Sequence, residues 1–191
     1  MSPLRRGLGI LIGRFQPFHF GHQFLISRAL EFCEKLILVI GSADAPRSLK
    51  NPFNLEERLT CIEGNLESFL SERDRIKILS LRDYPEDKDW VLALEEKISP
   101  YLDAYSPVLI GHEKDLSTYY LKLFPQWTEC FFGSYQEIHA TEIREAFFAG
   151  NLWGNAEMCR KLPLPTQKFL HDFEARPEYL ELKIQAAKEI R

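Results

Sequence analysis

The sequence predicts an α/β fold in which helices flank a parallel β-sheet on both faces. Short apolar runs alternate along the chain with segments whose apolar residues recur at helical spacing, and this alternation is typical of parallel sheets. Three of the runs, residues 8–13, 36–41 and 107–111, end in glycine and are followed by polar segments of unusual composition. Because ligands of such sheets bind beyond the carboxyl ends of the strands, we expect a binding site at this edge.

The first third of the chain predicts two buried strands and two helices. Residues 8–13 and 36–41 are short apolar runs, which is typical of buried strands. Residues 22–35, which lie between them, place apolar side chains at helical spacing. Residues 54–70 follow a proline and begin with asparagine, which favours a helix capped by Asn54.

The alternation continues through the middle of the chain. Residues 75–81 alternate apolar and polar side chains as a strand does, and residues 89–99 show helical spacing. Two further strands are expected over residues 107–111 and 127–132, with a helix over residues 115–124 between them.

The last third of the chain predicts helices only. A helix is expected over residues 141–151, with Thr141 as its cap and a glycine-asparagine pair at its end. Beyond it, two amphipathic helices broken near Pro177 form a C-terminal helical extension. We therefore divide the chain into a main domain, residues 1–162, and an extension, residues 163–191.

The composition is that of a globular protein without disulfides. Of the 191 residues, 45% are hydrophobic and 27% are charged, and the formal net charge is −4. A net acidic chain is a poor general binder of nucleic acid. The cysteines form no CxxC pair, the apolar stretch behind Arg5 and Arg6 is too short for a signal peptide, and no apolar run approaches the length of a membrane span. We expect a cytoplasmic protein that binds neither nucleic acid nor membranes.

The segment GRFQPFHFGH, directly after the first expected strand, predicts a phosphate site. Gly13 permits a sharp turn, and Gly21 permits a close approach of the backbone to a ligand. His19 and His22 can donate hydrogen bonds to an oxyanion, Arg14 adds a positive charge, and the helix that follows offers the positive end of its dipole. The alternatives are surface histidines or a metal site, but no third acidic or thiol ligand is evident nearby.

The segment TEIR is a second candidate for phosphate binding. Thr141 offers a hydroxyl, and Arg144 lies one turn further along the same side of the helix. A guanidinium group can bind two phosphate oxygens at once. Taken alone, the segment is equally typical of a plain helix cap with a surface arginine.

Together these motifs resemble a known family. HxGH after the first strand and TxxR late in the chain are similar to the HxGH nucleotidyltransferase superfamily. The longer GRFQPFHFGH resembles nicotinamide mononucleotide (NMN) adenylyltransferases of the archaeal type and the adenylyltransferase half of bacterial bifunctional enzymes that carry a Nudix hydrolase domain. The segment LIGHEKDLSTYYLKLFPQW is most similar to the bifunctional subgroup. The resemblance covers residues 8–175 and implies a Rossmann-like nucleotidyltransferase fold. His139 stands where the second motif usually has serine.

The resemblance implies transfer of the adenylyl group of ATP to NMN, which gives NAD and pyrophosphate, with Mg²⁺ delivered by ATP and no metal ligand from the protein. The implied catalytic residues are His19, His22, Arg14, Lys50 and Arg144. The implied ATP-binding residues are Gly13, Phe15, Gln16, Gly21, Thr141 and Ile143. The implied NMN-binding residues are Trp90, Gly111, His112, Lys114 and Asp115.

Several alternatives stay open at this point. The chain could transfer an adenylyl or cytidylyl group to another phosphate acceptor, such as phosphopantetheine, FMN, or a sugar or glycerol phosphate. A nucleotide-sensing module that binds without turnover is a second class. Arg47 is a weaker phosphate candidate than Lys50, Arg58 could pair with Glu57, and Trp90 could be a core residue. The sequence does not decide the oligomeric state or the preference between NMN and its acid form.

The helical extension resembles the segment that leads into the Nudix domain of the bifunctional enzymes. We expect no Nudix site in it, because its carboxylates lack the glycine-led, glutamate-paired arrangement of that motif; they are Glu174, Glu178, Glu181 and Glu189. Its apolar residues are expected to pack on the transferase domain or on a second copy of the chain in a homo-oligomer; they are Phe169, Phe173, Tyr179, Leu180, Leu182 and Ile184. We therefore expect a structural extension and a single activity.

Overall fold

The computed structural model describes residues 7–102, 105–112, 122–133 and 135–189. Its described residues form two compact units. One, the sheet unit, falls within Met1–Arg14, Phe24–Asp44 and Phe69–Ser134. The other, the helical unit, falls within Phe15–Gln23, Ala45–Ser68 and Tyr135–Arg191. The predicted boundary between residues 162 and 163 stays a prediction, and the two helices that follow it belong to the helical unit.

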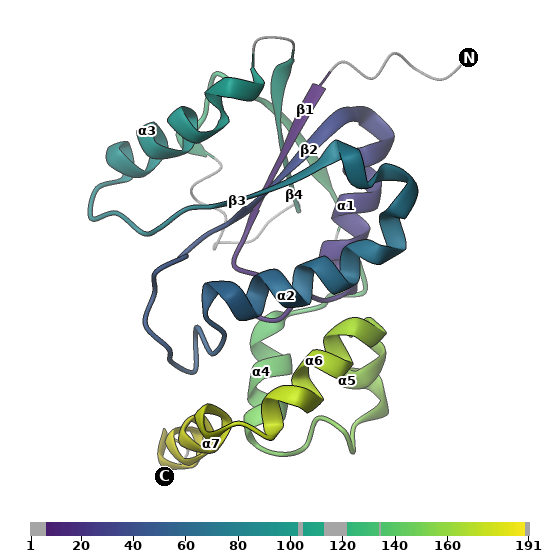
Figure 1. Cartoon of the computed structure of the whole chain (residues 1–191), viewed down its shortest axis with the longest axis vertical. Coiled ribbons are helices and arrows are strands. Elements are labelled where there is room, and N and C mark those ends of the chain that lie inside the picture. Colours follow the sequence, from purple (N-terminus) through teal and green to yellow (C-terminus); the bar gives the residue numbers. More distant parts are fainter. Residues whose placement is uncertain (1–6, 103–104, 113–121, 134, 190–191) are drawn as a thin grey trace. The chain divides into compact units, whose positions relative to one another are not determined.

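A five-stranded parallel sheet forms the centre of the sheet unit among the described residues, as the sequence predicts (Figure 1). Its strands are β1 (Gly7–Gly13), β2 (Cys33–Ile40), β3 (Ile76–Ser80), β4 (Ser106–His112) and β5 (Thr128–Phe132). Their order is β3-β2-β1-β4-β5, and every neighbouring pair is parallel. The chain therefore adds strands first on one side of β1 and then on the other. This reversal places a topological switch point between β1 and β4, where ligands of such sheets bind.

The sheet unit contains some of the helices, and the helical unit contains the rest. The sheet unit contains η1 (Glu67–Arg75, from Phe69 on), α3 (Asp87–Ile98), η2 (Ser99–Tyr101) and the larger part of α1 (Phe20–Phe32). The helical unit contains the first turn of α1 and α2 (Leu55–Leu66), α4 (Ala140–Phe148), α5 (Ala156–Arg160), α6 (Leu164–Glu174) and α7 (Pro177–Glu189). No helix within the described ranges combines the length and the apolar character that a membrane span needs.

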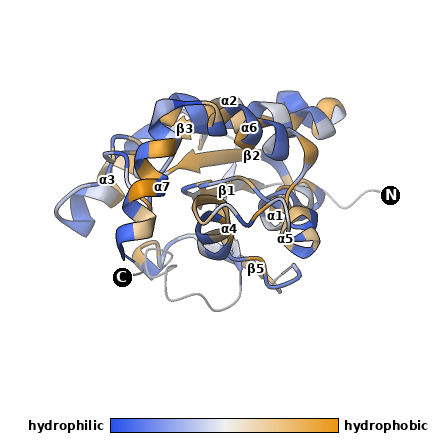
Figure 2. Ribbon diagram, turned by 90° about the horizontal axis from the view of Figure 1, so that it is seen from below, coloured by the Kyte–Doolittle hydropathy of each residue, from blue (hydrophilic) through white to orange (hydrophobic). Residues whose placement is uncertain are grey.

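The core of the sheet unit lies on both faces of the sheet. On one face, buried residues of β1 pack with Leu94 and Ile98 of α3 and with Phe124 and Trp127. Successive side chains of a strand point to opposite faces, so Leu11 and its neighbours form the second buried layer. Figure 1 shows α1 on the side of the sheet opposite α3. Figure 2 shows β2 in the hydrophobic colour, whereas α7 has mixed colours. Strand β2 is apolar because it is buried on both faces of the sheet.

Helices α1 and α2 end earlier than the sequence predicts. The helix expected over residues 22–35 begins at Phe20 and ends at Phe32, because Cys33–Ile40 pairs with β1 as strand β2. The helix expected over residues 54–70 ends at Leu66 and continues as the tighter helix η1. The helix expected over residues 115–124 lies almost entirely outside the described residues.

The helix cap predicted at Thr141 is wrong, whereas the cap predicted at Asn54 is confirmed. Helix α4 begins at Ala140 with His139 as its N-cap, and Thr141 lies inside the first turn. The hydroxyl of Thr141 accepts a hydrogen bond from Arg144 at 3.0 Å. At α2 the Asn54 side chain accepts from the backbone N–H of Glu57, and the Glu57 carboxylate accepts from that of Asn54, which is a capping box.

Aromatic residues from distant parts of the chain form the core of the helical unit. The Phe53 ring meets Phe169 and Phe173 edge-on, with ring centroids 5.0 and 4.9 Å away. The ring centroids of Phe147 in α4 and Tyr179 in α7 are 5.0 Å apart. In the extension Phe169, Phe173, Tyr179 and Leu182 are buried, whereas Leu180 and Ile184 are exposed. The extension thus packs most of its apolar residues inside this unit.

Candidate nucleotide site

The residues implied in nucleotide binding fall into two groups, one in each unit. The helical unit contains Phe15, Gln16, His19, Gly21, His22, Lys50, Thr141, Ile143 and Arg144. The sheet unit contains Gly13, Arg14, Trp90, Gly111 and His112. Lys114 and Asp115 lie outside the described residues.

The turn after β1 is made by Phe15 rather than by Gly13. Phe15 adopts a left-handed backbone conformation, with φ of 52°, whereas Gly13 is not among the residues with positive φ. The left-handed conformation usually favours glycine, because the lack of a Cβ removes the steric penalty. Here the Phe15 side chain is 2% exposed and packs against Phe18 and His22, and this packing offsets the penalty.

The two histidines of HxGH stack on each other. Their ring centroids are 3.7 Å apart and the rings are inclined by 28°. The backbone N–H of His19 donates to Nδ1 of His22 at 3.2 Å. In the neutral His22 ring the proton therefore lies on Nε2, which makes this atom a hydrogen-bond donor.

The glycine of HxGH is required by the His19 ring. A Cβ on Gly21 would lie 2.9 Å from Nδ1 and 3.0 Å from Cε1 of His19. Any side chain at this position would push the imidazole out of its stack with His22. The motif thus needs glycine for a steric reason inside the protein, in addition to the ligand approach expected from the sequence.

Hydrogen bonds of Gln16 connect the HxGH loop to the segment before α2. Its Nε2 donates to the carbonyl of Phe53 at 2.9 Å, and its Oε1 accepts from the backbone N–H of Phe53 at the same distance. The Gln16 side chain is buried, so these hydrogen bonds are shielded from water. The resemblance implies that Gln16 contacts ATP, and the structure adds a structural role for its side chain.

Arg144 links α4 to the same loop. Its NH1 donates to the carbonyl of Gln16 at 2.8 Å, and its NH2 donates to Oγ1 of Thr141 at 3.0 Å. The arginine is 7% exposed, so its guanidinium is held in one orientation. Ile143, on the same helix, is fully buried.

Lys50 lies at the tip of a tight turn. The backbone N–H and C=O groups of Ser48 and Asn51 pair with each other in both directions at 3.1 Å, with Leu49 and Lys50 between them. Lys50 is exposed and makes no hydrogen bond or ion pair within the part of the chain that the structure describes. Its ammonium group is therefore available to an anionic ligand. We call residues 48–51 the Lys50 turn.

The neighbouring arginines have structural partners. Arg47 donates to both carboxylate oxygens of Glu57, at 2.9 and 3.1 Å. Arg58 is 1% exposed, and its Nε donates to the Asn54 carbonyl at 3.3 Å. Glu57, which the sequence offers as a partner of Arg58, pairs with Arg47.

One chain of contacts thus unites three segments that are far apart in the sequence. The Lys50 turn precedes Phe53, Phe53 bonds to Gln16 of the HxGH loop, and Gln16 bonds to Arg144 of α4. All of these residues belong to the helical unit. The sequence did not predict Phe53 as a link, because main-chain hydrogen bonds to a glutamine leave no residue-type pattern.

In the sheet unit, the implied residues follow the carboxyl ends of the strands. The Gly41 N–H donates to the Gly13 carbonyl at 2.9 Å, which joins the ends of β1 and β2. Gly111 and His112 end β4, the neighbour of β1 at the switch point. These positions agree with the expectation that polar segments meet at one sheet edge.

Trp90 lies at the start of α3 and is half-buried. Its ring centroid is 6.0 Å from that of Phe124, which stacks on Trp127 at 4.0 Å. The indole thus has one side on the core and keeps part of its surface exposed. This placement suits a core residue and equally suits a platform for a ligand ring.

Two of the cysteines are buried thiols that are poor nucleophiles near neutral pH. Burial raises the pKa of Cys33 to about 11 and that of Cys61 to about 11 as well. All four cysteines are free thiols. No group of three or more His, Cys, Asp or Glu side chains that could hold a metal ion occurs within the described ranges.

Sequence comparison finds a family model and several relatives that are similar to this chain. Residues 10–146 match the family model described as cytidylyltransferase-like. A relative from Acinetobacter baylyi named nicotinamide/nicotinic acid mononucleotide adenylyltransferase is 38% identical over 91% of this chain and 90% of its own length. A nicotinamide-nucleotide adenylyltransferase from Archaeoglobus fulgidus is 28% identical over 74% of this chain and 80% of its own length.

Solved structures with the same fold include a bifunctional NMN adenylyltransferase/ADP ribose pyrophosphatase from Francisella tularensis. It matches 97% of this chain with a TM-score of 0.87 and 31% identity. A structure of such a protein from the same organism with AMP and a manganese ion gives a TM-score of 0.84 and 30% identity. This chain spans 54% of the length of each of those chains.

Proposed function

We propose an activity from the premise that this chain belongs to the cytidylyltransferase-like family and, within it, to the mononucleotide adenylyltransferases. The chain transfers the adenylyl group of ATP to nicotinamide mononucleotide and releases NAD and pyrophosphate. The observation that carries this proposal is the chain of contacts through Gln16, which unites the HxGH loop, the Lys50 turn and Arg144 in one unit. A polyphosphate needs several positive or donor groups held together, and these segments supply them.

The reaction needs positioning and charge stabilisation rather than a protein nucleophile. A phosphate monoester oxygen of NMN, already anionic near neutral pH, attacks the α-phosphorus of ATP. A new bond forms between that oxygen and the α-phosphorus, the bond from the α-phosphorus to the bridging oxygen of the β-phosphate breaks, and pyrophosphate leaves with the electron pair. Because no covalent enzyme intermediate is required, the enzyme gains rate by holding the groups in line.

The histidines of the HxGH loop act on the α-phosphate. The Nε2 proton of His22 is fixed by the hydrogen bond at Nδ1, and His19 is stacked beside it. Such oriented donors stabilise the negative charge that develops as the leaving group departs. Arg14 is assigned to the same phosphate by the resemblance.

The β- and γ-phosphates are assigned to Lys50, Thr141 and Arg144. Lys50 offers a point charge at the tip of its turn, and the Arg144 guanidinium is held by Gln16 and Thr141. Phe15, Gln16, Gly21 and Ile143 then shape the ATP site, as the resemblance implies. His139, in place of the motif serine, caps α4 without a side-chain hydrogen bond.

Mg²⁺ is proposed to arrive bound to the phosphates of ATP. The described residues contain no group of side chains that could hold the ion alone, and a solved relative was crystallised with AMP and manganese. When bound, the ion neutralises phosphate charge. Lys50 and Arg144 supply the remaining positive charge from this chain.

NMN is assigned to residues at the carboxyl edge of the sheet unit. Gly13, Gly111 and His112 lie at the ends of β1 and β4, and Trp90 offers an indole face to the cationic nicotinamide ring. Lys114 and Asp115 stay predictions from the resemblance. The Trp90→Ala variant should weaken use of NMN about tenfold more than use of ATP, as expected from loss of a cation–π contact. Steady-state kinetics with each substrate varied in turn measures this. An equal loss for both substrates together with a lower melting temperature would favour a core role.

The four free thiols and the substrates ATP and NMN support a cytoplasmic location. We propose no nucleic-acid or membrane partner. A homo-oligomer remains a proposal that a mass measurement in solution can address.

A pyrophosphate-release assay over a panel of acceptors tests the proposed function. The panel contains NMN, nicotinic acid mononucleotide, phosphopantetheine, FMN and glycerol phosphate, each with ATP and Mg²⁺, and NAD is identified directly in the NMN reaction. Release with the pyridine mononucleotides supports the proposal and ranks the two. Release only with another acceptor, or ATP binding without any release, contradicts it and favours one of the alternatives.

A further inference from the structure

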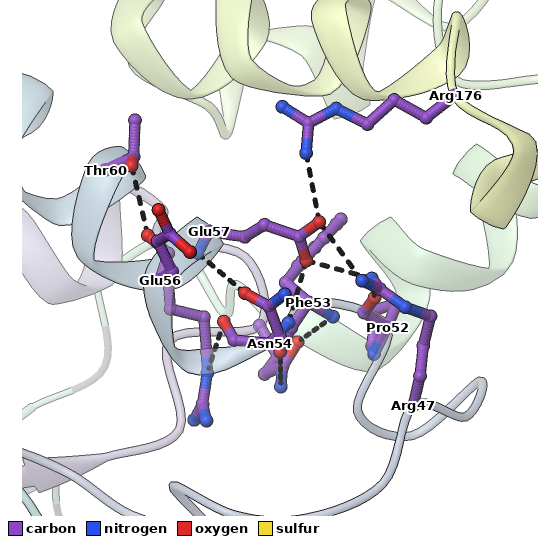
Figure 3. Close-up of polar contacts among 10 residues, drawn as sticks. Arg47, Pro52, Phe53, Asn54, Glu56, Glu57, Thr60 and Arg176 are labelled. Atoms are coloured by element: carbon purple, nitrogen blue, oxygen red, sulfur yellow. Dashed lines mark hydrogen bonds and ion pairs between the residues drawn. The ribbon is translucent and has the colours of Figure 1, made fainter.

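A single buried carboxylate connects the segment of the Lys50 turn with the C-terminal helices. Glu57, at the start of α2, is 7% exposed, and its carboxylate accepts hydrogen bonds from three residues (Figure 3). Its Oε2 accepts from the backbone N–H of Asn54 at 2.8 Å and from NH1 of Arg47 at 2.9 Å. Its Oε1 accepts from NH2 of Arg47 at 3.1 Å and from NH1 of Arg176 at 3.0 Å. Arg176 lies between α6 and α7, 119 residues away in the sequence.

Arg47 is the residue that transmits this connection to the Lys50 turn. It directly precedes the turn, and its NH1 also donates to the carbonyl of Pro52, directly beyond the turn. By its hydrogen bonds to both Glu57 and Pro52, Arg47 holds the two ends of the Lys50 turn together. The far end of the segment is held by the two hydrogen bonds between Phe53 and Gln16.

Both arginines add charge and packing to this cluster. The guanidinium groups of Arg47 and Arg176 lie 5.6 and 5.7 Å from the centre of the Phe173 ring, which is fully buried. Two positive charges share one negative charge, so the cluster keeps a net charge of about +1 near the turn that bears Lys50. Loss of Arg176 would remove one donor from a buried carboxylate and leave Arg47 with a rearranged partner.

We infer that Arg176 is a positioning residue for the triphosphate of ATP. It acts through Glu57 and Arg47 and holds the Lys50 turn in the conformation that meets the β- and γ-phosphates. This inference rests on the proposed function in that it assumes Lys50 to be a polyphosphate ligand. It gives the C-terminal helices a role in substrate binding beyond packing.

Nucleotide binding to the full chain tests the inference without any acceptor substrate. Calorimetry compares AMP with a non-hydrolysable ATP analogue that has a methylene bridge between the α- and β-phosphates. The Arg176→Ala variant should raise the Kd of the analogue about tenfold and should change that of AMP little, because AMP lacks the phosphates that Lys50 contacts. General damage to the fold would weaken both ligands.

Two further variants make the comparison specific. Arg160, at the end of α5, is an exposed arginine of the same unit, and Arg160→Ala controls for the lost charge. Arg176→Lys keeps a cation that can donate to Glu57 and should restore most of the affinity for the analogue. In a Glu57→Gln background, Arg176→Ala should add little, because the path through Glu57 is already broken.

The outcomes separate the inference from the proposed function. An unchanged ratio of the two Kd values in Arg176→Ala, or equal weakening in Arg160→Ala, overturns the inference while the activity on NMN stands. A wild-type chain that binds the analogue but forms no NAD contradicts the proposed function, and the Kd ratio then still decides the inference. A wild-type chain that binds neither nucleotide overturns both. If Arg176→Ala does not fold, Arg176→Gln carries the test, with a selective loss of analogue binding as support and an unchanged ratio as refutation.

Discussion

At the level of single residues, His22 has the most defined chemistry in the candidate site. A backbone donor at Nδ1 places its proton on Nε2, so the hydrogen bond that we propose to the α-phosphate would be oriented before the substrate arrives. The His22→Ala variant should lower kcat roughly a hundredfold or more, which is the usual effect of losing one oriented donor. Steady-state kinetics and thermal melting measure the loss and check the fold.

His171 offers a matched control for His22. It is an exposed histidine on α6 of the same unit, outside the proposed site. The His171→Ala variant should keep kcat within about twofold of the wild type. A folded His22→Ala variant with the kcat of the wild type would remove this residue from the proposed mechanism.

Gly21 allows activity and stability to be separated. A methyl group at this position would displace the His19 ring, and a misplacement of this size costs roughly tenfold to a hundredfold in rate. Because Gly21 lies in α1, alanine should favour the helix by up to about 1 kcal/mol, so Gly21→Ala should lose activity without a matching loss of stability.

Gly154→Ala is the comparison for this effect, since its Cβ would meet its nearest neighbour, the Asn151 carbonyl, at an ordinary 3.8 Å. Equal kcat values for Gly21→Ala and the wild type would show that the stack of the two histidines does not matter for catalysis.

At the level of elements, α6 stabilises the segment that carries the site. Phe173 of α6 is fully buried against Phe53, and two guanidinium groups lie over its ring. The Phe173→Ala variant should lower the free energy of unfolding by about 3–5 kcal/mol, as measured by urea denaturation. Leu164→Ala, on the same helix and 78% exposed, should change it by less than about 0.5 kcal/mol. Similar values for the two variants would contradict the role assigned to α6.

The order of elements could be predicted from the sequence because it depends on local periodicity. The apolar runs of β1, β2 and β4 and the capping pattern at Asn54 are local signals, and each gave an element of the right type. The boundary between α1 and β2 could not be predicted, because Cys33 is placed by pairing with Gly7. The cap predicted for α4 is wrong because the helix begins at Ala140, one residue before Thr141.

For the candidate site, the sequence indicates which residues are chemically suitable and leaves open how they are held. The histidines, Lys50 and Arg144 follow from motifs. The links through Phe53, Glu57 and Arg176 use main-chain groups or pairs separated by more than a hundred residues, and no short pattern encodes such pairs. Arg47 illustrates the limit, because its residue type suits phosphate and its actual partner is a carboxylate.

At the level of the whole molecule, buried thiols predict a loss of stability at alkaline pH. Burial raises the pKa of Cys61 from 9.0 to about 11 in the folded chain. A folded pKa above the unfolded value gives stability that is present below pH 9 and is lost as the pH rises toward 11. The effect of this one thiol is on the order of 2 kcal/mol.

Denaturation of the wild type and of Cys61→Ala at pH 8 and pH 11 isolates the contribution of this thiol from that of other alkaline groups. The difference in unfolding free energy between the two proteins should shift by this amount, with the wild type losing more. A constant difference would mean that Cys61 ionises equally in both states.

The helical unit draws on three separate stretches of chain, and this has a consequence for the order in which the protein is made. Arg144 meets Gln16 across 128 residues and Arg176 meets Glu57 across 119. While a ribosome extends the chain, the early sheet strands can already pair and Gln16 can bond to Phe53, but the HxGH loop lacks Arg144 until α4 emerges. The segment that contains the Lys50 turn lacks its contacts with the C-terminal helices until α6 and α7 have also been synthesised. Closure of such long loops is slow relative to local folding, so a nascent chain should complete the proposed triphosphate site only after α7 has emerged.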